Sequence, residues 1–278
     1  MIETVKNKLI KNGYVTINNV INKRVINSAK KIINNELKLI LKKKRLKTFN
    51  SITKNFLNCK KIFSQHHLQV ILAKKLETNG IYHSLLSEKK IVNILVNFLG
   101  PDIEYETNNE LAINITNVKD DYYLKKYHQE YWSGVGISCM LLWIPLNLKS
   151  NMGSIEMIKE SHKWGHIPHK NREPVHLPNN YKSENIKITE GSVVLFTPLT
   201  IHRTVPNKSN EIRIALPISV RNWYYPKSGN EDLWEYKKLQ TSFYSKFRKI
   251  LGNKEFSPFR TLGETRKSIF EYEKLRKL

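Results

Sequence analysis

The chain has 278 residues, of which 40% are hydrophobic and 26% charged, a balance that excludes a disordered or fibrous protein and is typical of a globular one. Two cysteines, Cys59 and Cys139, are too few for a disulfide framework and favour a reducing compartment. Lysine and arginine total 47 against 24 acidic residues, a formal net charge of +23. This charge favours anionic partners, but the lysines are spread along the whole chain, so general surface charge is the simpler interpretation.

No run reaches the roughly 18 consecutive apolar residues of a membrane-spanning helix, and the first residues lack the apolar core of a secretory signal. We therefore expect a cytoplasmic protein without a membrane span. The sequence also lacks the P-loop, the dinucleotide-binding glycine pattern and the nucleophile elbow of hydrolases.

The N-terminal part is predicted to be mostly helical. Residues 9–20 are typical of a short strand entered through an Asn-Gly turn, and residues 21–47 space their apolar side chains as an amphipathic helix with a basic outer face. Helical turns and loops are expected over 49–80. A further helix is predicted from an N-cap at Ser87 to about Leu99, where a Gly-Pro pair stops it.

From residue 103 the sequence changes to short apolar or alternating runs separated by turn residues, which indicates a β-sandwich or barrel. The predicted strands are 110–116, 135–146, 154–158, 186–188, 192–196 and 212–220. Residues 231–251 return to a helical pattern, and the charged tail 264–278 is also typical of a helix. We expect a single domain over 1–278, with a helical part (1–102), a β core (103–223) and a helical C-terminal extension (224–278).

Three residues form a candidate metal site. Positions 128 and 130 lie on the same face of a strand, so the imidazole of His128 and the carboxylate of Glu130 can reach one ion. His202, which follows the predicted strand 192–196, is the best candidate for a second histidine. Two histidines and one carboxylate are the ligand set of non-haem Fe(II) oxygenases, which keep open positions for a 2-oxo acid and O2. A His-x-Glu pattern alone is weak and is more often surface or core decoration.

Arg213 strengthens this interpretation because it lies on the next apolar strand after His202. A guanidinium at that place can hold a carboxylate through two charge-assisted hydrogen bonds. The alternative is an ion pair at the rim of the sheet, and the alternation of Arg213 with apolar neighbours leaves both open.

Other residues near the candidate site have weaker indications. His162 belongs to a group with His166 and His169, but glycine and proline interrupt any helix there, which disfavours an independent zinc site. His162 either orients the substrate or only hydrogen-bonds its own loop, and we favour the second. Trp143 is expected to build a pocket wall and can line the co-substrate site. Arg221 is either a second anion contact for the substrate or a solvated strand end.

Taken together, these motifs resemble the phytanoyl-CoA dioxygenase (PhyH-like) family of Fe(II)/2-oxoglutarate-dependent oxygenases over most of residues 8–223. No single segment is specific, but the ordered set is. The segments are Gly13-Tyr14-Val15, Leu99-Gly100-Pro101, His128-Gln129-Glu130, Trp143-Ile144-Pro145-Leu146, Asn151 to Gly153, Ser161-His162-Lys163, Gly191 to Phe196, His202 and Arg213.

The resemblance implies a mainly β fold with flanking helices around a double-stranded β-helix, or jelly-roll, core. It also implies Fe(II) on His128, Glu130 and His202, with 2-oxoglutarate paired with Arg213 and O2 as the oxidant. Two positions depart from the family pattern. Glu130 stands where the family usually has aspartate, which keeps an oxygen ligand but lengthens it by one methylene. A Lys-Glu pair at 159–160 replaces a Pro-Gly pair, which concerns the loop and not the metal site.

The resulting hypothesis is a dioxygenase that hydroxylates a small molecule in lipid, sugar or secondary-metabolite biosynthesis, with anionic or carrier-linked substrates as leading candidates because lysines crowd the loops. The alternative is a non-enzymatic jelly-roll binding protein, or an oxygenase directed at nucleic acid through the basic surface. Nucleic-acid oxygenases with a related core pair two arginines after the distal histidine more closely than Arg213 and Arg221 are spaced. Nucleic acid is therefore the less favoured partner.

Overall fold

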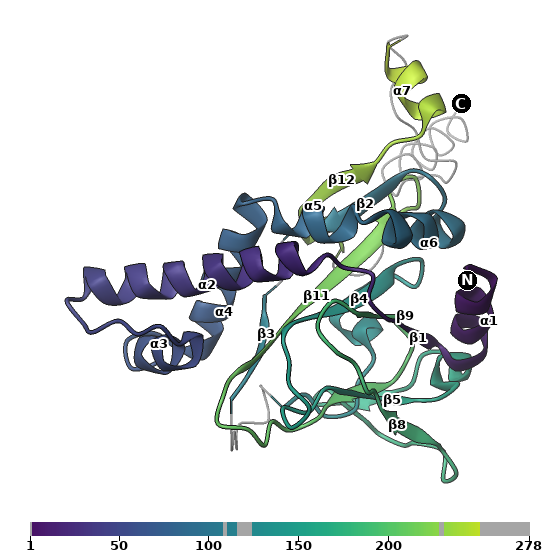
Figure 1. Cartoon of the computed structure of the whole chain (residues 1–278). Helices are drawn as coiled ribbons and strands as arrows, with labels where there is room; N and C mark the ends of the chain where they lie inside the picture. Colours follow the sequence, from purple (N-terminus) through teal and green to yellow (C-terminus); the bar gives the residue numbers. More distant parts are fainter. Residues whose placement is uncertain (1, 108–109, 116–123, 228–230, 251–278) are drawn as a thin grey trace, which may run out of the picture.

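The computed structural model describes residues 2–107, 110–115, 124–227 and 231–250. In this part the helices within residues 23–99 lie on one side of the large antiparallel sheet, while the first and the last helix lie apart from them (Figure 1). The helices are α1 (Ile2–Asn12), α2 (Lys23–Lys43), α3 (Ile52–Cys59), α4 (Gln65–Thr78), α5 (Ile81–Leu86), α6 (Lys89–Leu99) and α7 (Phe243–Ile250), with short 3-10 helices η1 (Glu130–Ser133), η2 (Ser161–Trp164) and η3 (Glu231–Leu233). The strands are β1 (Tyr14–Ile17), β2 (Ile103–Glu106), β3 (Ala112–Asn114), β4 (Met140–Asn147), β5 (Ile155–Ile158), β6 (His169–Lys170), β7 (Glu173–Pro174), β8 (Ser183–Asn185), β9 (Val193–Phe196), β10 (His202–Thr204), β11 (Arg213–Asn222) and β12 (Tyr236–Gln240).

The predicted amphipathic helix over 21–47 is confirmed as α2. Its side chains at Ile26, Ala29, Ile33, Leu37 and Leu41 are buried, and they follow the three-and-four spacing of one helix face. The side chain of Asn22 caps the helix by accepting the amide N–H of Arg24 at 2.9 Å. The serines before α3 and α4 cap those helices in the same way.

The described strands form a seven-stranded sheet in the order β1-β9-β4-β11-β2-β12, with β3 also paired to β11, a three-stranded sheet in the order β10-β5-β8, and a two-stranded sheet of β6 and β7. The two long strands β4 and β11 form the centre of the seven-stranded sheet, and their register pairs Leu216 with Ile144 and Val220 with Met140. Neighbours that are distant in sequence, such as β9 beside β1 and β4, are what a jelly roll requires. The predicted mainly β fold with a jelly-roll core and flanking helices is confirmed.

The large sheet separates two apolar layers, because alternate residues of a strand face opposite sides. On β4, Leu142 and Ile144 pack in the cluster that includes the buried faces of α2, α4, α5 and α6. Leu141 and Trp143 point the other way, into a second cluster with residues of β5. The helices therefore fill the outer face of the sheet, and the inner layer between the sheets is left for the polar site.

Several predicted boundaries were wrong. Residues 9–12 end helix α1 and only Tyr14–Ile17 form the strand. Ser87 closes α5 instead of capping the next helix, which begins at Lys89 after Glu88. The strand expected at 186–188 lies at Ser183–Asn185, where all three residues are exposed.

The C-terminal extension is not uniformly helical. Within 231–251, residues Tyr236–Gln240 form β12, which pairs antiparallel with β2 at the edge of the large sheet. Helix is confined to η3 and α7. The helix expected over 264–278 lies outside the described residues.

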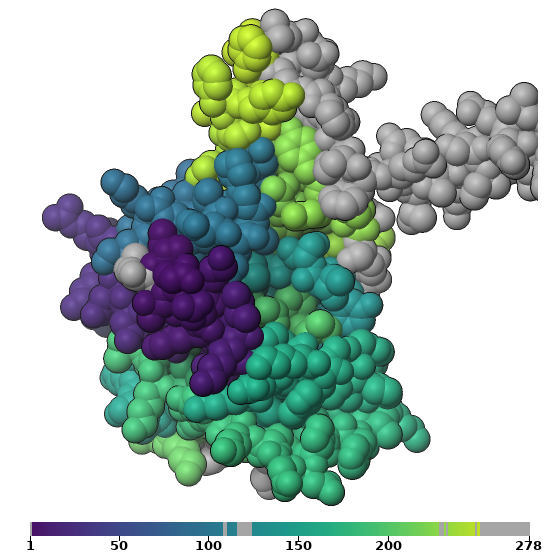
Figure 2. Space-filling model, turned by 90° about the vertical axis from the view of Figure 1, so that its right-hand side faces the viewer, coloured from purple at the N-terminus to yellow at the C-terminus, as the bar shows by residue number. Residues whose placement is uncertain are grey.

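Helix α1 packs against the loop that follows β5 (Figure 2). The amide N–H of Glu160 donates to the carbonyl oxygen of Asn12 at 3.0 Å, and the ring of His162 contacts the carbonyl oxygen of Ile10 at 3.0 Å. Among the described helices, none combines the length and the apolar character needed to cross a bilayer.

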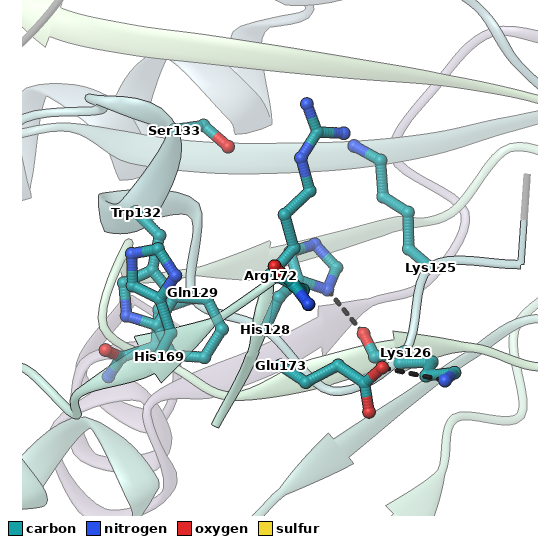
Figure 3. A pocket seen from close by; sticks show the side chains of 10 residues that line it. Lys125, Lys126, His128, Gln129, Trp132, Ser133, His169, Arg172 and Glu173 are labelled. Atoms are coloured by element: carbon teal, nitrogen blue, oxygen red, sulfur yellow. Dashed lines mark hydrogen bonds and ion pairs between the residues drawn. The ribbon is translucent and has the colours of Figure 1, made fainter. Parts of the chain in front are cut away.

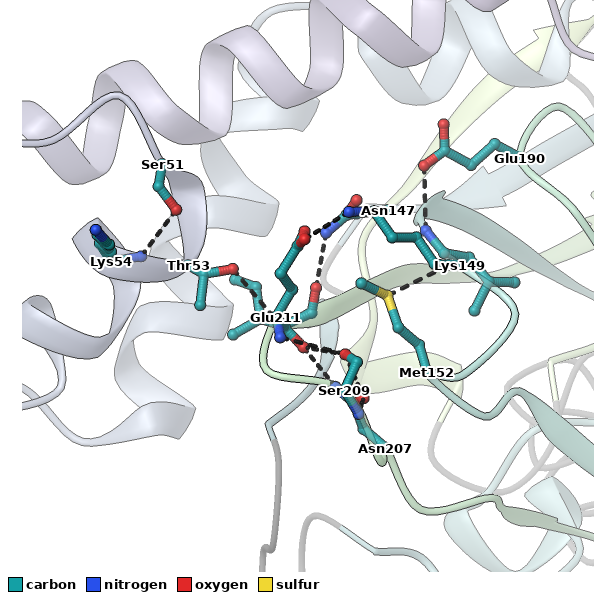
Figure 4. A network of polar contacts seen from close by, with 12 residues as sticks. Ser51, Thr53, Lys54, Asn147, Lys149, Met152, Glu190, Asn207, Ser209 and Glu211 are labelled. Carbon is teal, nitrogen blue, oxygen red and sulfur yellow. Dashed lines mark hydrogen bonds and ion pairs between the residues drawn. The ribbon is translucent and has the colours of Figure 1, made fainter.

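A polar network fixes the start of β11 (Figure 4). The amide N–H of Ile212 donates to the hydroxyl of Thr53 at the start of α3, and its carbonyl accepts the side-chain amide of Asn147 at 2.7 Å. The preceding turn is held by the side chain of Asn207, which donates to the carbonyl of Glu211 at 2.7 Å. Since Ile212 is bonded from both sides, the next residue, Arg213, has a fixed place in the inner layer.

Candidate metal centre

The three predicted ligands converge. His128 and His202 form an isolated antiparallel bridge, in which each backbone N–H donates to the other residue's carbonyl, at 2.9 and 3.1 Å. Glu130 comes two residues after His128 and is the first residue of η1. One ligand atom from each of the three lies within 4.8 Å of the others.

The prediction that a strand would present His128 and Glu130 on one face is met only in part. The chain is extended at Gln129, with φ −106° and ψ 138°, and then turns into a 3-10 helix at Glu130. The carboxylate still reaches the imidazoles. Its Oε1 lies 3.3 Å from Nε2 of His128 and 3.4 Å from Nε2 of His202.

Hydrogen bonds on the far side of each ring determine which nitrogen faces the site. Nδ1 of His128 lies 2.7 Å from the carbonyl oxygen of Lys126, and Nδ1 of His202 lies 3.0 Å from that of Thr200. Carbonyl oxygens only accept, so both Nδ1 atoms carry the hydrogen and both neutral rings direct an Nε2 lone pair inward. Two lone pairs and a carboxylate oxygen therefore face one another, which is unfavourable unless a cation lies between them.

The distances fit a metal ion. Two ligands at roughly 2.1 Å from an ion and at right angles to each other are about 3 Å apart, close to the contacts of Glu130 with the two Nε2 atoms. Burial is the main cause that lowers the pKa of His128, and it favours the neutral form of this imidazole near pH 7. Burial raises the pKa of Glu130, but the charge of Lys125 opposes it and helps to hold that pKa well below its usual value.

Arg213 is buried in the inner layer, with 3% of its surface exposed. Its Nη1 donates to the carbonyl oxygens of Ser154 at 2.8 Å and Val205 at 3.1 Å, while its Nε has no hydrogen-bond partner in the described part of the chain. No described carboxylate pairs with it, and burial lowers its pKa to about 10. A buried guanidinium without a paired carboxylate requires an anion for full stabilisation.

The cavity at Arg213 reaches the strand that carries His202. A small cavity of about 60 Å³ is lined by Arg213 together with Thr204 and Lys125. Thr204 is two residues after His202 on β10, so both side chains leave the strand on the same face. The ring of Trp143 lies 5.8 Å from the guanidinium of Arg213, and its place in a co-substrate site stays a prediction.

The other two candidates have structural surroundings. His162 lies at the contact with α1, and it is not among the residues that line the cavity beside His128. Arg221 is not a solvated strand end, since only 1% of its surface is exposed. Its guanidinium lies 3.3 Å from Glu104 and 3.5 Å from Glu231, so two carboxylates already neutralise it. These contacts favour a structural role for both residues over substrate binding.

Sequence reasoning gave no role to Gln129, which is fully buried. Its side-chain amide donates to the carbonyls of Gly165 at 2.8 Å and Leu199 at 2.7 Å, and its oxygen accepts the N–H of Ile167 at 3.1 Å. It therefore ties the segment between two ligands to two other loops. Its place between the ligands in the sequence is the only signal that could have indicated it.

Fold and site together define a metal-dependent jelly-roll oxygenase. The sequence profile described as Phytanoyl-CoA dioxygenase (PhyH) matches residues 9–215, and the chain belongs to this family. It is therefore an oxidoreductase of the non-haem iron, 2-oxoglutarate-dependent class, and the prediction of the family and of its cofactors is confirmed. None of the curated proteins matches the chain.

Solved structures show the same fold. A non-heme monooxygenase, ThoJ in its apo form, superposes with a TM-score of 0.60 at 15% identity, covering 86% of this chain and 84% of that one. Its nickel complex gives 0.56 at 12% identity and 97% of each chain. The epimerase SnoN, in complex with Fe3+, alpha ketoglutarate and nogalamycin RO, gives 0.51 at 11% identity, covering 80% of this chain and 83% of that one. At these identities the similarity concerns the fold alone.

Proposed function

We propose that this protein hydroxylates a small, anionic or carrier-linked molecule, with Fe(II) held by His128, Glu130 and His202. The observation that carries the proposal is the convergence of two imidazole Nε2 atoms and one carboxylate oxygen, all of them acceptors, with no proton donor between them. With Fe(II), O2 and 2-oxoglutarate bound, such a site converts 2-oxoglutarate to succinate and CO2 and adds one oxygen atom to a C–H bond of the substrate.

The protein's own part in this reaction is to fix the ligands. The backbone bridge between His128 and His202 sets the distance between the two rings, whose centroids are 4.2 Å apart. The carbonyls of Lys126 and Thr200 fix the tautomer of each ring by accepting its Nδ1 proton. The two imidazoles are thus already oriented for an ion.

Arg213 is proposed to hold the distal carboxylate of 2-oxoglutarate. Its free Nε and its position over the Trp143 ring leave one edge of the guanidinium for a bidentate contact. The burial of Arg213 would keep water from that ion pair and strengthen it. The fixed start of β11 would set the distance between this anchor and the metal.

The proposed single domain over 1–278 is supported by the large sheet. It takes β1 from the N-terminal part and β12 from the C-terminal part, so neither flanking part can be removed without exposing an edge of the core.

Succinate production tests the proposal. Purified protein supplied with Fe(II), 2-oxoglutarate and O2 should form succinate slowly without substrate, and faster with the true substrate in a panel of small anionic metabolites. The Arg213→Gln variant should form far less at the same 2-oxoglutarate concentration. Absence of any iron- and 2-oxoglutarate-dependent succinate from folded protein would contradict the proposed function.

A further inference from the structure

The positive charge of the chain is balanced by acidic residues in some places and not in others. On the wall of the cavity beside His128, Lys126 and Glu173 form an ion pair of 2.7 Å (Figure 3). Between Glu36 and Glu77, by contrast, the sequence contains no aspartate or glutamate. The cations of this interval can therefore be neutralised only by acidic residues from elsewhere in the fold.

The cations that gather where α2 meets α3 have no such partner. Figure 1 shows this junction projecting from the left of the molecule, with α3 beneath the end of α2. The Nζ atoms of Lys47 and Lys54 lie 5.6 and 5.9 Å from the ring centroid of Phe49, and Nζ of Lys38 lies 3.3 Å from Oδ1 of Asn50. None of the cations at this junction forms an ion pair with a described residue. We call them the basic tip, which consists of Lys38, Lys42, Lys43, Lys44, Arg45, Lys47 and Lys54.

The backbone of the basic tip is held in one conformation. Helix α2 ends in a Schellman motif, in which the N–H groups of Arg45 and Leu46 donate to carbonyl oxygens in the last turn of the helix, both at 2.9 Å. Arg45 has φ +56°, the left-handed conformation that this motif usually gives to glycine. The fully buried side chain of Asn55 accepts the N–H of Phe49 and donates to its carbonyl, both at 2.8 Å. The cations are thus displayed from a fixed loop.

Helix stability accounts for only some of these charges. Lys42 and Lys43 lie in the last turn of α2, where a cation is favourable beside the negative end of the helix dipole. Lys54 lies in the first turn of α3, where a cation is unfavourable, and Lys47 lies in neither helix. Neighbouring like charges also repel each other. A group of exposed cations that the local structure does not favour indicates an anionic partner.

Exposed leucines lie among these cations. In the loop, Leu46 stands between two of them in the sequence. Leu39 shares a face of α2 with Lys43, and Leu57 shares a face of α3 with Lys54. The exposed fractions of the leucines are 42%, 45% and 42% for 39, 46 and 57. A bilayer surface can bind both kinds of side chain, leucines at the acyl boundary and lysines at anionic headgroups, whereas the phosphate backbone of a nucleic acid binds only the cations.

We infer that the basic tip docks on the surface of an anionic lipid bilayer, with its cations at the headgroups and its leucines at the acyl boundary. The inference goes beyond the proposed function and does not depend on it. Because the leucines are few, most of the attraction is electrostatic, and docking is reversible and weakened by salt.

Co-sedimentation of the full-length protein with vesicles tests this inference. The vesicles are phosphatidylcholine alone, and phosphatidylcholine mixed with phosphatidylglycerol at about three to one. At low salt the protein should bind the anionic vesicles about tenfold or more tighter than the neutral ones. Salt at about 1 M should remove most of this difference, because the Debye length falls to about 3 Å. Equal binding to both kinds of vesicle, or binding to neither, would overturn the inference.

Paired lysine variants separate the basic tip from the overall charge. The double variant Lys43→Gln, Lys44→Gln should bind anionic vesicles about tenfold more weakly. The matched control Lys6→Gln, Lys8→Gln removes the same charge from exposed positions of α1, on the other side of the molecule (Figure 1). Its binding should change by less than about twofold, since α1 would be distant from the bilayer. Equal losses in the two double variants would overturn the inference.

Leu46→Asn separates a bilayer from a nucleic acid as the partner. It keeps every charge, so binding to anionic vesicles should fall about fivefold through the lost apolar contact alone, and unchanged binding would contradict the place given to the leucines. A duplex oligonucleotide is the second probe. Duplex binding that is lost in Lys43→Gln, Lys44→Gln and kept in Leu46→Asn, without binding to vesicles, would assign the tip to nucleic acid and overturn the inference. Urea unfolding checks that each variant is folded, and the assay contains no iron or 2-oxoglutarate, so its failure would leave the proposed function standing.

Discussion

His128 and His202 are joined backbone to backbone, each donating its N–H to the other's carbonyl at 2.9 and 3.1 Å. The pair lies on segments far apart in the sequence, yet its spacing is that of neighbouring strands, which the sheet cannot easily change. Glu130, on a short 3-10 helix, is the ligand whose reach depends on its side-chain length. The two histidines and the glutamate should therefore respond differently to substitution.

Shortening the carboxylate should weaken metal binding without abolishing it. Glu130→Asp withdraws the oxygen by about 1.5 Å, one carbon–carbon bond, so we expect Fe(II) affinity to fall by roughly tenfold or more. Glu130→Gln keeps the length but removes the charge and should bind more weakly still. Anaerobic calorimetric titration with Fe(II) measures both, and an Asp variant that binds as tightly as the native protein would contradict the placement of Glu130 as a ligand.

Arg213→Gln should separate co-substrate binding from stability. The substitution removes an unpaired buried charge, which is favourable, and hydrogen bonds to two carbonyls, which is unfavourable, so the free energy of unfolding should change by less than about 2 kcal/mol. The stabilisation by 2-oxoglutarate, about 2.7 kcal/mol at a hundred times the dissociation constant, should vanish. Thermal unfolding with and without 2-oxoglutarate in the presence of Mn(II) measures both. Undiminished stabilisation of the variant would show that another residue binds the co-substrate.

Gln129→Leu should impair both folding and the site. It leaves the carbonyls of Gly165 and Leu199 and the N–H of Ile167 without their partner, and we expect a loss of about 3 kcal/mol in unfolding free energy. Metal affinity should fall as well, because Gln129 lies between two ligands. Gln69→Leu is the matched control, since among the described residues the amide of that buried glutamine donates to the carbonyl of Leu111 and its oxygen has no partner. It should cost less stability and leave metal affinity unchanged.

The sequence predicted the residues of the site better than the contacts that hold those residues in place. His128, Glu130, His202 and Arg213 are polar residues at fixed intervals from apolar strands, and such intervals can be read without coordinates. The role of Gln129 could not be predicted, since its three partners come from loops brought near only by the fold. Of the two alternatives for Arg221, the solvated strand end was wrong, because its two carboxylates, Glu104 and Glu231, are distant in sequence and could not be paired with it.

The same reason explains the boundaries that were wrong. The core helix α2 and the strands β4 and β11 have long regular patterns, and the existence of these elements was predicted correctly. The start of β4 was wrong, since the strand expected over 135–146 begins at Met140. Strand β12 has only a short, lysine-rich pattern, and it is a strand because the edge of β2 offers unpaired backbone groups. Tertiary pairing of this kind outweighs local propensity.

The ion pair beside the site should make stability depend on pH. Burial raises the pKa of Glu156, but hydrogen bonds from Tyr127 and Arg203 outweigh it and lower that pKa below its usual value. A lowered folded-state pKa stabilises above the unfolded value of about 4.3, and this stability is lost as pH falls through the folded value. Glu156→Gln should thus be less stable by about 1 to 2 kcal/mol at pH 7, and the difference should disappear toward pH 3. A difference that persists at low pH would refute this explanation.

Gly13 is required by a close approach between α1 and the site loops. It has φ +86°, and a Cβ there would lie 2.5 Å from Nδ1 of His162 and 2.6 Å from Oγ1 of Thr200. Gly13→Ala should therefore cost about 2 kcal/mol or more of unfolding free energy, from backbone strain and the clash together. Gly80→Ala has a similar φ, +70°, but nothing within 4 Å, and should show only the backbone part, about 1 kcal/mol. Equal losses in urea unfolding would contradict the role given to the contact.

The central claim is that His128, Glu130 and His202 hold iron with 2-oxoglutarate bound beside it. Fe(II) and 2-oxoglutarate added without oxygen to the native protein should produce the weak visible charge-transfer band of the chelate. The band should be lost in His128→Ala and in His202→Ala. It should remain in His162→Ala, because the hydrogen bond described for the His162 ring is to the carbonyl oxygen of Ile10 in helix α1. No band in the folded native protein, or an unchanged band in His128→Ala, would contradict the assignment.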